Sequence, residues 1–258
     1  MFDLSGRVAL VTGSSRGLGE GIAICLAEAG ADVVVNYTSE SSAAKANAVA
    51  EKIKAMGRRC ICVRADVSNE EDVKAMIAAI EQEFGALDIL CSNAGITTSG
   101  LNIDQLDYAE WSRVINTNLG GAFLVTKYSL PLIRKSKHGR IIYLSSIVAH
   151  QGALFGQVHY ASTKGALISF AKTLARQEAL NGITVNTISP GTHLTEGIAE
   201  VHGTAAPSDR MAGIIAKIPM GYLGNEKDIG YGVVYIASDE ARYMTGATLD
   251  VNGGFVMR

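Results

Sequence analysis

The chain has 258 residues, and its hydrophobic content of 48% is enough to bury a large core in one domain. A formal charge of −2 provides no overall basic field, so the composition disfavours nucleic acid and anionic membranes as partners and favours a small-molecule substrate. The sequence shows no signal-peptide pattern and no apolar run of about 18 residues, so we expect a cytoplasmic protein without a membrane span.

Short apolar runs rich in β-branched residues alternate with longer segments of helical pattern. Several of these runs are apolar at nearly consecutive positions, which is typical of strands covered on both faces. The intervening segments are long enough for helical crossovers, so the sequence predicts a doubly wound parallel sheet in a single α/β domain, 1–258. The seven expected strands are residues 7–13, 32–37, 59–66, 87–95, 140–146, 183–190 and 248–254.

Three glycines follow the first expected strand directly. Gly13, Gly17 and Gly19 form a TGxxxGxG arrangement at the start of an amphipathic helix. Glycine permits a tight turn and a close backbone approach, and the helix N-terminus offers free N–H groups and a positive dipole end. The pattern therefore predicts a pyrophosphate-binding loop.

The four cysteines lie inside apolar segments and form no CxxC pattern. Cysteine in such a setting behaves as a small hydrophobe, so we expect neither a disulfide nor a metal site. These cysteines are Cys25, Cys60, Cys62 and Cys91.

A tyrosine and a lysine stand four positions apart in "HYASTKGAL". On a helix this spacing is about one turn, a rise of roughly 6 Å, so Tyr160 and Lys164 would share one face. An isolated YxxxK pair is also compatible with an ordinary half-buried helix surface. The rest of the chain must decide between the two interpretations.

An irregular interval lies between the strand that ends at Pro190 and a helix expected near Glu226. Short amphipathic pieces in it are broken by glycine and proline, which predicts a lid at about residues 192–220 rather than a second domain. Its apolar residues could close a wall over the site or could simply pack. They are Ile198, Val201, Met211, Ile214 and Ile215.

Taken in order, these motifs resemble those of the short-chain dehydrogenase/reductase family over nearly the whole chain. "TGSSRGLG" resembles the cofactor loop of that family, "NAG" its fourth-strand motif and "YASTK" its active-site YxxxK. Further matches are Asp66 in "ADV", Asn118 in "NTNLGGAF", Ser146, "SPGTHLT" and "LDVNGG". The resemblance implies a Rossmann fold and a nicotinamide cofactor.

By this resemblance Asp66 bonds the adenine with Val67 beside the ring, while "NAG" lines the ribose side. Judged alone, Asp66 could instead cap a loop and "NAG" could simply turn the chain. His193 departs from the family, which more often has a branched aliphatic residue there. The cofactor residues implied are Gly13, Ser15, Arg16, Gly17, Leu18, Gly19, Tyr37, Thr38, Asp66, Val67, Asn93, Ala94, Gly95, Tyr160, Lys164, Pro190, Gly191, His193 and Thr195.

The family's catalytic positions match Asn118, Ser146, Tyr160 and Lys164. The resemblance implies that Tyr160 exchanges a proton with the substrate oxygen, that Ser146 donates to the same oxygen, and that Asn118 holds a water linking Lys164 to solvent. A free phenol has a pKa of about 10, so we expect the Lys164 ammonium and an oxidised nicotinamide to lower the pKa of Tyr160. If Ser145 pointed inward instead, the serine role would move by one residue.

The end of the second expected strand bears on the choice of cofactor. Tyr37 stands where NAD-specific relatives place an acidic residue, so no carboxylate at that position repels a 2′-phosphate. Arg16 could pair with that phosphate, and Asn36, Thr38 and Ser39 could donate neutral hydrogen bonds, although nearby Glu40 could weaken the field. We expect NADP(H) to be preferred, with NAD(H) still possible.

The resemblance thus implies an NAD(P)-dependent oxidoreductase acting on a carbonyl/alcohol pair, most simply an NADPH-dependent reductase of a 3-oxoacyl-like or small ketone. A sugar, polyol or other secondary-alcohol dehydrogenase is an alternative, and a non-catalytic dinucleotide-binding sensor is a second. The helix expected at 160–180 is apolar on most sides, which favours a homodimer or, following the family, a homotetramer. Its apolar or small residues include Ala161, Ala166, Leu167, Ile168, Phe170, Ala171 and Leu174.

Overall fold

The computed structural model describes residues 1–98, 101–154, 156–194 and 209–258. Seven strands form one sheet in the order β3-β2-β1-β4-β5-β6-β7, and every neighbouring pair is parallel. The predicted doubly wound parallel sheet is therefore confirmed. The strands are β1 Val8–Val11, β2 Asp32–Tyr37, β3 Cys60–Arg64, β4 Ile89–Ser92, β5 Arg140–Leu144, β6 Thr184–Pro190 and β7 Thr248–Val251.

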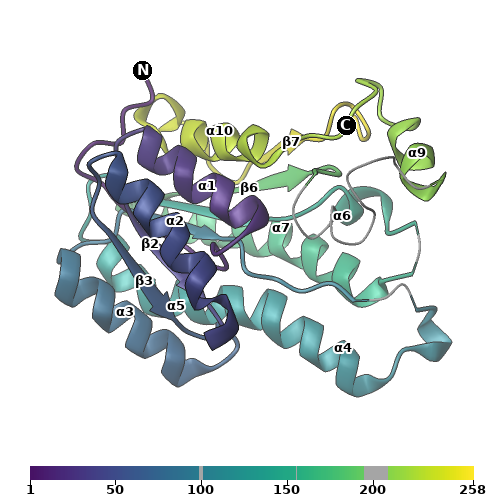
Figure 1. The fold of residues 1–258 in the computed structure, drawn as a ribbon, viewed down its shortest axis with the longest axis horizontal. Coiled ribbons are helices and arrows are strands. Elements are labelled where there is room, and N and C mark those ends of the chain that lie inside the picture. Colours follow the sequence, from purple (N-terminus) through teal and green to yellow (C-terminus); the bar gives the residue numbers. More distant parts are fainter. Residues whose placement is uncertain (99–100, 155, 195–208) are drawn as a thin grey trace.

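Helices cover both faces of the sheet (Figure 1). On one face α1 packs against α2 and α10, and on the other α3 packs against α5 and α4 against α7. These helices are α1 Gly17–Glu28, α2 Ala43–Ala55, α3 Glu70–Phe84, α4 Tyr108–Ile115, α5 Gly121–Ile133, α7 Val158–Glu178 and α10 Glu226–Ala237. The shorter elements are η1 Glu40–Ser42, η2 Ile103–Gln105, the π-turn η3 Asn116–Gly120, α6 Val148–Gln151, η4 Ala179–Asn181, α9 Asp209–Ile215 and η5 Asp239–Ala241.

The two hydrophobic cores explain why the strands read as apolar runs. Successive residues of β1 alternate between them, with Ala9 and Val11 in the core under α1 and Val8 and Leu10 in the core under α3 and α5. A strand buried on both faces needs apolar side chains at each position. The same rule leaves few polar residues inside the central strands.

Helix α7 positions the tyrosine and lysine of the YxxxK motif. It begins after Gln157, whose φ of 66° is left-handed, and Leu167 and Ala171 bury its sheet-facing side in the core. That packing fixes the rotation of the helix. Tyr160 and Lys164, at its first turns, consequently lie against the end of β5.

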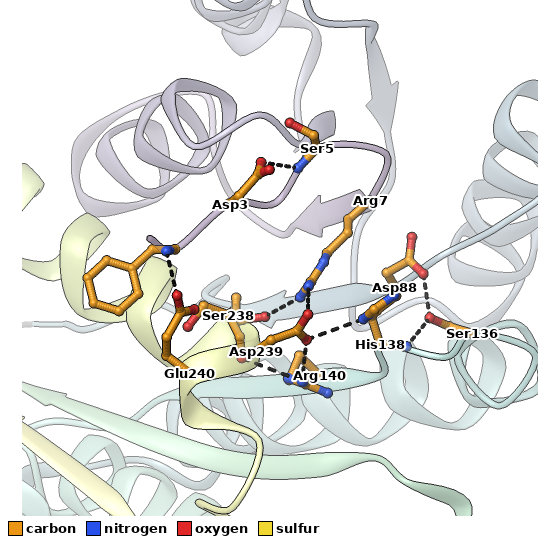
Figure 2. A network of polar contacts seen from close by, with 12 residues as sticks. Asp3, Ser5, Arg7, Asp88, Ser136, His138, Arg140, Ser238, Asp239 and Glu240 are labelled. Carbon is orange, nitrogen blue, oxygen red and sulfur yellow. Dashed lines mark hydrogen bonds and ion pairs between the residues drawn. The ribbon is translucent and has the colours of Figure 1, made fainter.

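The N-terminal ends of the strands carry a charged cluster (Figure 2). Arg7, just before β1, and Arg140, the first residue of β5, are 5% and 4% exposed. Both contact the carboxylate of Asp239, at 2.8 and 3.2 Å, and His138 approaches it to 3.3 Å. These ion pairs therefore lie at the end of the sheet opposite to the glycine loop and the YxxxK motif.

Among the described residues, no helix combines the length and the apolar character that crossing a membrane requires. The predicted lid falls largely on the segment before α9. Of its apolar residues, Ile198 and Val201 lie outside the described residues. The lid and the single-domain boundaries stay predictions.

Candidate active site

The glycine loop between β1 and α1 forms a backbone cradle. Gly13 and Gly17 have φ values of 62° and 59°, which favour glycine. At Gly19 a Cβ atom would lie 2.4 Å from the Gly13 carbonyl oxygen, so no side chain fits there. The free N–H groups at the start of α1 face this turn, and Arg16 is exposed beside them.

The loop after β4 is bound to the loop after β1. The Asn93 amide donates to the carbonyl oxygens of Thr12 and Gly13, at 2.8 and 3.1 Å. The Thr12 hydroxyl accepts from the backbone N–H groups of Asn93 and Ala94, at 3.0 and 2.9 Å. The "NAG" motif therefore does more than turn the chain, because its side chain fixes the glycine cradle. Thr12, which the sequence analysis did not single out, is its partner.

Asn36 has a different role from the one predicted. It is fully buried, its Oδ1 accepts from the Gly13 N–H at 3.0 Å, and its Nδ2 lies within 3.1 Å of the Ala65 carbonyl oxygen. The expectation that Asn36 donates to a 2′-phosphate is wrong, because these contacts occupy the amide. It joins the glycine loop to β2 and β3 instead.

Tyr160 and Ser146 come together from α7 and the end of β5. The Ser146 hydroxyl forms a hydrogen bond with the Tyr160 phenol and also accepts from the Val148 N–H at 3.3 Å. Ser145 is 3% exposed and donates to the Lys164 carbonyl oxygen at 2.9 Å. The structure therefore leaves Ser146 as the serine paired with the phenol.

Lys164 is a buried cation without an anionic partner among the described residues. It is 5% exposed, its Nζ donates to the Leu144 carbonyl oxygen at 2.6 Å, and it lies 5.5 Å from the centre of the Tyr160 ring. Burial lowers the pKa of Lys164 to about 8. Nearly all of this shift comes from removing the ammonium from water.

Burial also acts on the phenol, and in the free protein it shifts the pKa of Tyr160 in the direction opposite to the one expected with the oxidised cofactor. Burial raises the pKa of Tyr160, and the hydrogen bond from Ser146 only partly opposes it. In the free protein Tyr160 is therefore a protonated phenol near neutral pH. This state suits a proton donor.

Asn118 sits in the π-turn beside Gly95. Its side chain is 1% exposed, with Oδ1 accepting from the Ile96 N–H at 2.7 Å and Nδ2 donating to the Ile96 carbonyl oxygen at 2.9 Å. A Cβ on Gly95 would lie 3.2 Å from Asn118 Oδ1 and 3.7 Å from Lys164 Nζ. Asn118 and Lys164 thus flank the same glycine, although they do not contact each other directly.

Comparison with known proteins identifies the arrangement. A family model described as enoyl-(acyl carrier protein) reductase matches residues 13–256. The 3-oxoacyl-(acyl-carrier-protein) reductase FabG of Escherichia coli is 40% identical over 258 residues, covering 99% of each chain. The chain belongs to the short-chain dehydrogenase/reductase family. It is accordingly an oxidoreductase, as the motifs predicted.

Other proteins are similar to this chain over nearly its whole length. The FabG reductase of Staphylococcus aureus is 42% identical and covers 97% of this chain and 98% of its own. A blue fluorescent protein from a metagenomic library, solved in complex with NADPH, is 32% identical with a TM-score of 0.90, covering 99% of this chain and 100% of its own. A dehydrogenase/reductase from Sinorhizobium meliloti is 31% identical with a TM-score of 0.91, covering 99% and 97%.

One cavity of about 620 Å³ holds most of the residues that the family motifs imply. Its size suits a cofactor and part of a substrate. Ile96, Thr97 and Gln157 also line it, and sequence reasoning missed them because no motif marks them. Thr192 lines it too and was not singled out, although it lies within the "SPGTHLT" motif. The implied residues that line it are Gly13, Arg16, Gly17, Leu18, Gly19, Asn93, Gly95, Ser146, Tyr160, Lys164, Pro190, Gly191 and His193.

His193 closes one side of this cavity. Its ring is 4% exposed, packs on Gly224 and lies with Nδ1 3.0 Å from the Gly191 carbonyl oxygen, and burial lowers its pKa. The neutral imidazole therefore occupies the space where the family more often has an aliphatic side chain. Thr195, the last residue implied on this strand end, lies outside the described residues.

The remaining cofactor residues lie outside the cavity. Asp66 accepts from the Ser68 N–H and hydroxyl at 2.9 and 2.7 Å, which is the loop-capping alternative left open above. Val67 is 4% exposed and packs under Gly121, and its place beside the adenine stays a prediction. The others are Ser15, Ala94, Tyr37 at the end of β2 and Thr38 just beyond it. Asn118, implied as a catalytic residue, does not line the cavity either.

The described residues contain no group of three or more His, Cys, Asp or Glu side chains that could hold a metal ion. The four cysteines are free thiols, and burial raises the pKa of Cys25 and Cys60 to about 12.

Proposed function

We propose that this short-chain dehydrogenase/reductase reduces a ketone of the 3-oxoacyl type with NADPH and that Tyr160 donates the proton. The observation that carries the proposal is the convergence of Ser146, Tyr160 and Lys164 on the cavity that contains the glycine cradle. A loop after β1, a loop after β5 and one helix meet there. A binding protein without chemistry would not need a buried cation that has no anionic partner among the described residues beside a phenol.

Each residue has a separate task in the proposed reaction. A bound reduced nicotinamide would supply hydride to the carbonyl carbon. Tyr160 then gives its phenolic proton to the developing alkoxide, and Ser146 donates a hydrogen bond to the same oxygen. Lys164 stabilises the tyrosinate that remains, because an adjacent positive charge favours the ionised phenol.

The proposal for NADPH rests on the end of β2 and on Arg16. Tyr37 leaves that end without a carboxylate, and Arg16 is exposed on the glycine loop with its side chain on the cavity. A 2′-phosphate would gain a charge-assisted contact there. The blue fluorescent protein of similar fold was solved with NADPH, which supports the same choice.

The substrate is a small carbonyl compound, and the 3-oxoacyl class is favoured by the relatives. Both FabG proteins are named as 3-oxoacyl reductases, whereas the family description names an enoyl reductase. Ser146 and Tyr160 form a pair of donors suited to one carbonyl oxygen, so we favour reduction of C=O over C=C. A sugar or polyol dehydrogenase is the second candidate, since the same pair could serve an alcohol.

The deciding experiment is a panel of acetoacetyl, crotonyl, simple ketone and polyol substrates, each followed at 340 nm with both cofactors. We expect oxidation of NADPH with the acetoacetyl thioester and little with the crotonyl thioester. Turnover confined to polyols with NAD⁺ would replace this proposal by the alternative. Absence of turnover with cofactor bound would indicate the sensor.

The lid can be tested through its described part. Met211 in α9 is 5% exposed. If residues 192–220 shape the substrate pocket, Met211→Ala changes relative kcat/KM between short and bulky ketones by about 1 to 3 kcal/mol. Equal changes for all substrates would indicate packing instead.

We also propose a homotetramer or homodimer in the cytoplasm. Of the α7 residues named in the sequence analysis, Leu167, Ala171 and Leu174 pack in the hydrophobic core and are not available to a second subunit. Phe123 on α5 is 48% exposed and is available for such a contact. The free thiols suit a reducing compartment. Light scattering at micromolar concentration tests the assembly, and a monomer there would overturn it.

A further inference from the structure

The ends of β2 and β3 bring an arginine next to the place expected for the cofactor ribose. Tyr37 and Arg64 are the last residues of the two strands and are paired in register. Cys62, two residues before Arg64, packs in the core under α1 and α2, as does Tyr37. Because side chains alternate along a strand, Arg64 points to that same face.

Arg64 is engaged in an ion pair at this edge. Its Nη1 lies 3.2 Å from Oε2 of Glu40, the residue that opens η1 just beyond Tyr37, Thr38 and Ser39. The side chains are 59% and 81% exposed. A pair so exposed contributes little to folding. Its position, however, puts a carboxylate and its counter-ion beside the loop that follows β2.

That loop is where a dinucleotide fold receives the ribose 2′ position. A 2′-phosphate carries a charge of about −1.5 to −2, so an uncompensated Glu40 would repel it. The sequence alone pointed to this difficulty, and the structure supplies a counter-charge. The net charge of the Glu40–Arg64 pair is zero.

We propose that Arg64 is a specificity-determining residue for NADP(H), which acts by neutralising Glu40 at the edge of the 2′-phosphate site. The inference rests on the proposed use of NADPH. Arg16 contacts the phosphate, whereas Arg64 acts through Glu40 and removes a repulsion. Its effect is therefore electrostatic, depends on Glu40, and weakens as salt is added.

The test measures binding of NADP⁺ and NAD⁺ to the wild type, Arg64→Ala, Glu40→Gln and the double variant by titration calorimetry. Arg64→Ala should weaken NADP⁺ binding by about three- to tenfold at low salt and leave NAD⁺ within about twofold. The double variant should return to within about twofold of wild type, because the carboxylate is gone as well. At about 0.5 M salt the loss should shrink to near twofold.

Arg59→Ala is the matched control. Arg59 precedes the same strand at its other end, pairs with Glu83 at 2.7 Å and is 54% exposed. The substitution Arg59→Ala removes one cation far from the loop after β2, so NADP⁺ binding should stay within about twofold of wild type.

Three results would overturn the inference. A double variant as weak as Arg64→Ala would mean that Arg64 contacts the phosphate itself. Equal losses for Arg64→Ala and Arg59→Ala would indicate a general field effect. Full NADP⁺ affinity in Arg64→Ala would mean that the pair has no role. The wild type separates this failure from that of the proposed function, because a wild type that prefers NAD⁺ refutes the NADPH proposal before any variant is made.

Discussion

The two ends of the sheet bury cations in opposite ways. At the N-terminal end Arg7 and Arg140 share the carboxylate of Asp239 (Figure 2). At the C-terminal end Lys164 is as deeply buried as either arginine, yet its hydrogen-bond acceptor is the neutral Leu144 carbonyl oxygen. At the N-terminal end a carboxylate partly compensates the two cations and links the strands, whereas at the C-terminal end a cation without an anionic partner among the described residues faces a cavity.

The difference separates stability from chemistry. A buried cation whose only compensation is a carbonyl dipole is costly, and burial accordingly lowers the pKa of Lys164 to about 8. Such a cost is expected where a ligand or a transient anion completes the charge balance. Substitutions at the C-terminal end should therefore damage turnover or cofactor binding, and substitutions at the N-terminal end should damage folding.

The largest effect is expected for Tyr160→Phe. The change removes the proton donor and keeps the ring, so kcat should fall by at least about a hundredfold. Cofactor affinity should stay within a few-fold, and the melting temperature should barely change. Stopped-flow or steady-state assays at 340 nm check this. Retention of more than about a tenth of kcat would remove Tyr160 from the mechanism.

Arg16→Ala should give the next effect, confined to one cofactor. A charge-assisted contact with the 2′-phosphate is worth about 1.5 to 3 kcal/mol, so kcat/KM with NADPH should fall about ten- to a hundredfold. The value with NADH should change little. Equal losses with both cofactors would assign Arg16 to packing on the adenine, and a wild type that favours NADH would refute the cofactor preference.

Asp239→Asn tests the N-terminal end. The substitution keeps the shape and removes the charge between Arg7 and Arg140, so the free energy of unfolding should fall by about 1 to 3 kcal/mol, a range reduced because Asp239 is 55% exposed. Urea unfolding measures the loss. Michaelis constants for ketone and cofactor should match those of wild type, and a change in them without a change in stability would contradict the division between the two ends.

The sequence predicted the strands and the order of the motifs because both depend on local patterns. Continuous apolar runs such as that of β1 identify strands buried on both faces. Glycines at a fixed spacing identify a backbone loop that has no room for a Cβ atom, as at Gly19. What it could not predict was how side chains are oriented by distant contacts. Asn36 is turned inward by Gly13 and Ala65. Val67 is held in the core under Gly121.

The charge state of the site was also beyond the sequence. The spacing of the two residues suggests that Lys164 lowers the pKa of Tyr160, because the sequence shows which groups are charged but not how deeply they are buried. In the structure burial raises the pKa of the phenol. The resemblance already implied Ser146 rather than Ser145, and the contact of Ser145 with the Lys164 carbonyl oxygen is consistent with that choice.

The smallest effect is a pH dependence of stability that belongs to Lys164. Its pKa is about 8 in the folded protein against an ordinary value of 10.5, so between pH 8 and 10 the unfolded chain binds more protons and the free energy of unfolding rises with pH. Lys164→Met abolishes this rise. Between pH 7.5 and 9.5 the wild type should gain about 1 to 2 kcal/mol relative to the variant, measured by urea unfolding without cofactor. This rise ends above about pH 10. There Tyr160, whose pKa is raised by burial, keeps its proton in the folded state, so the free energy of unfolding falls as the pH increases further. Identical pH profiles for the two proteins would show that Lys164 is compensated after all, and the contrast between the two ends of the sheet would fail.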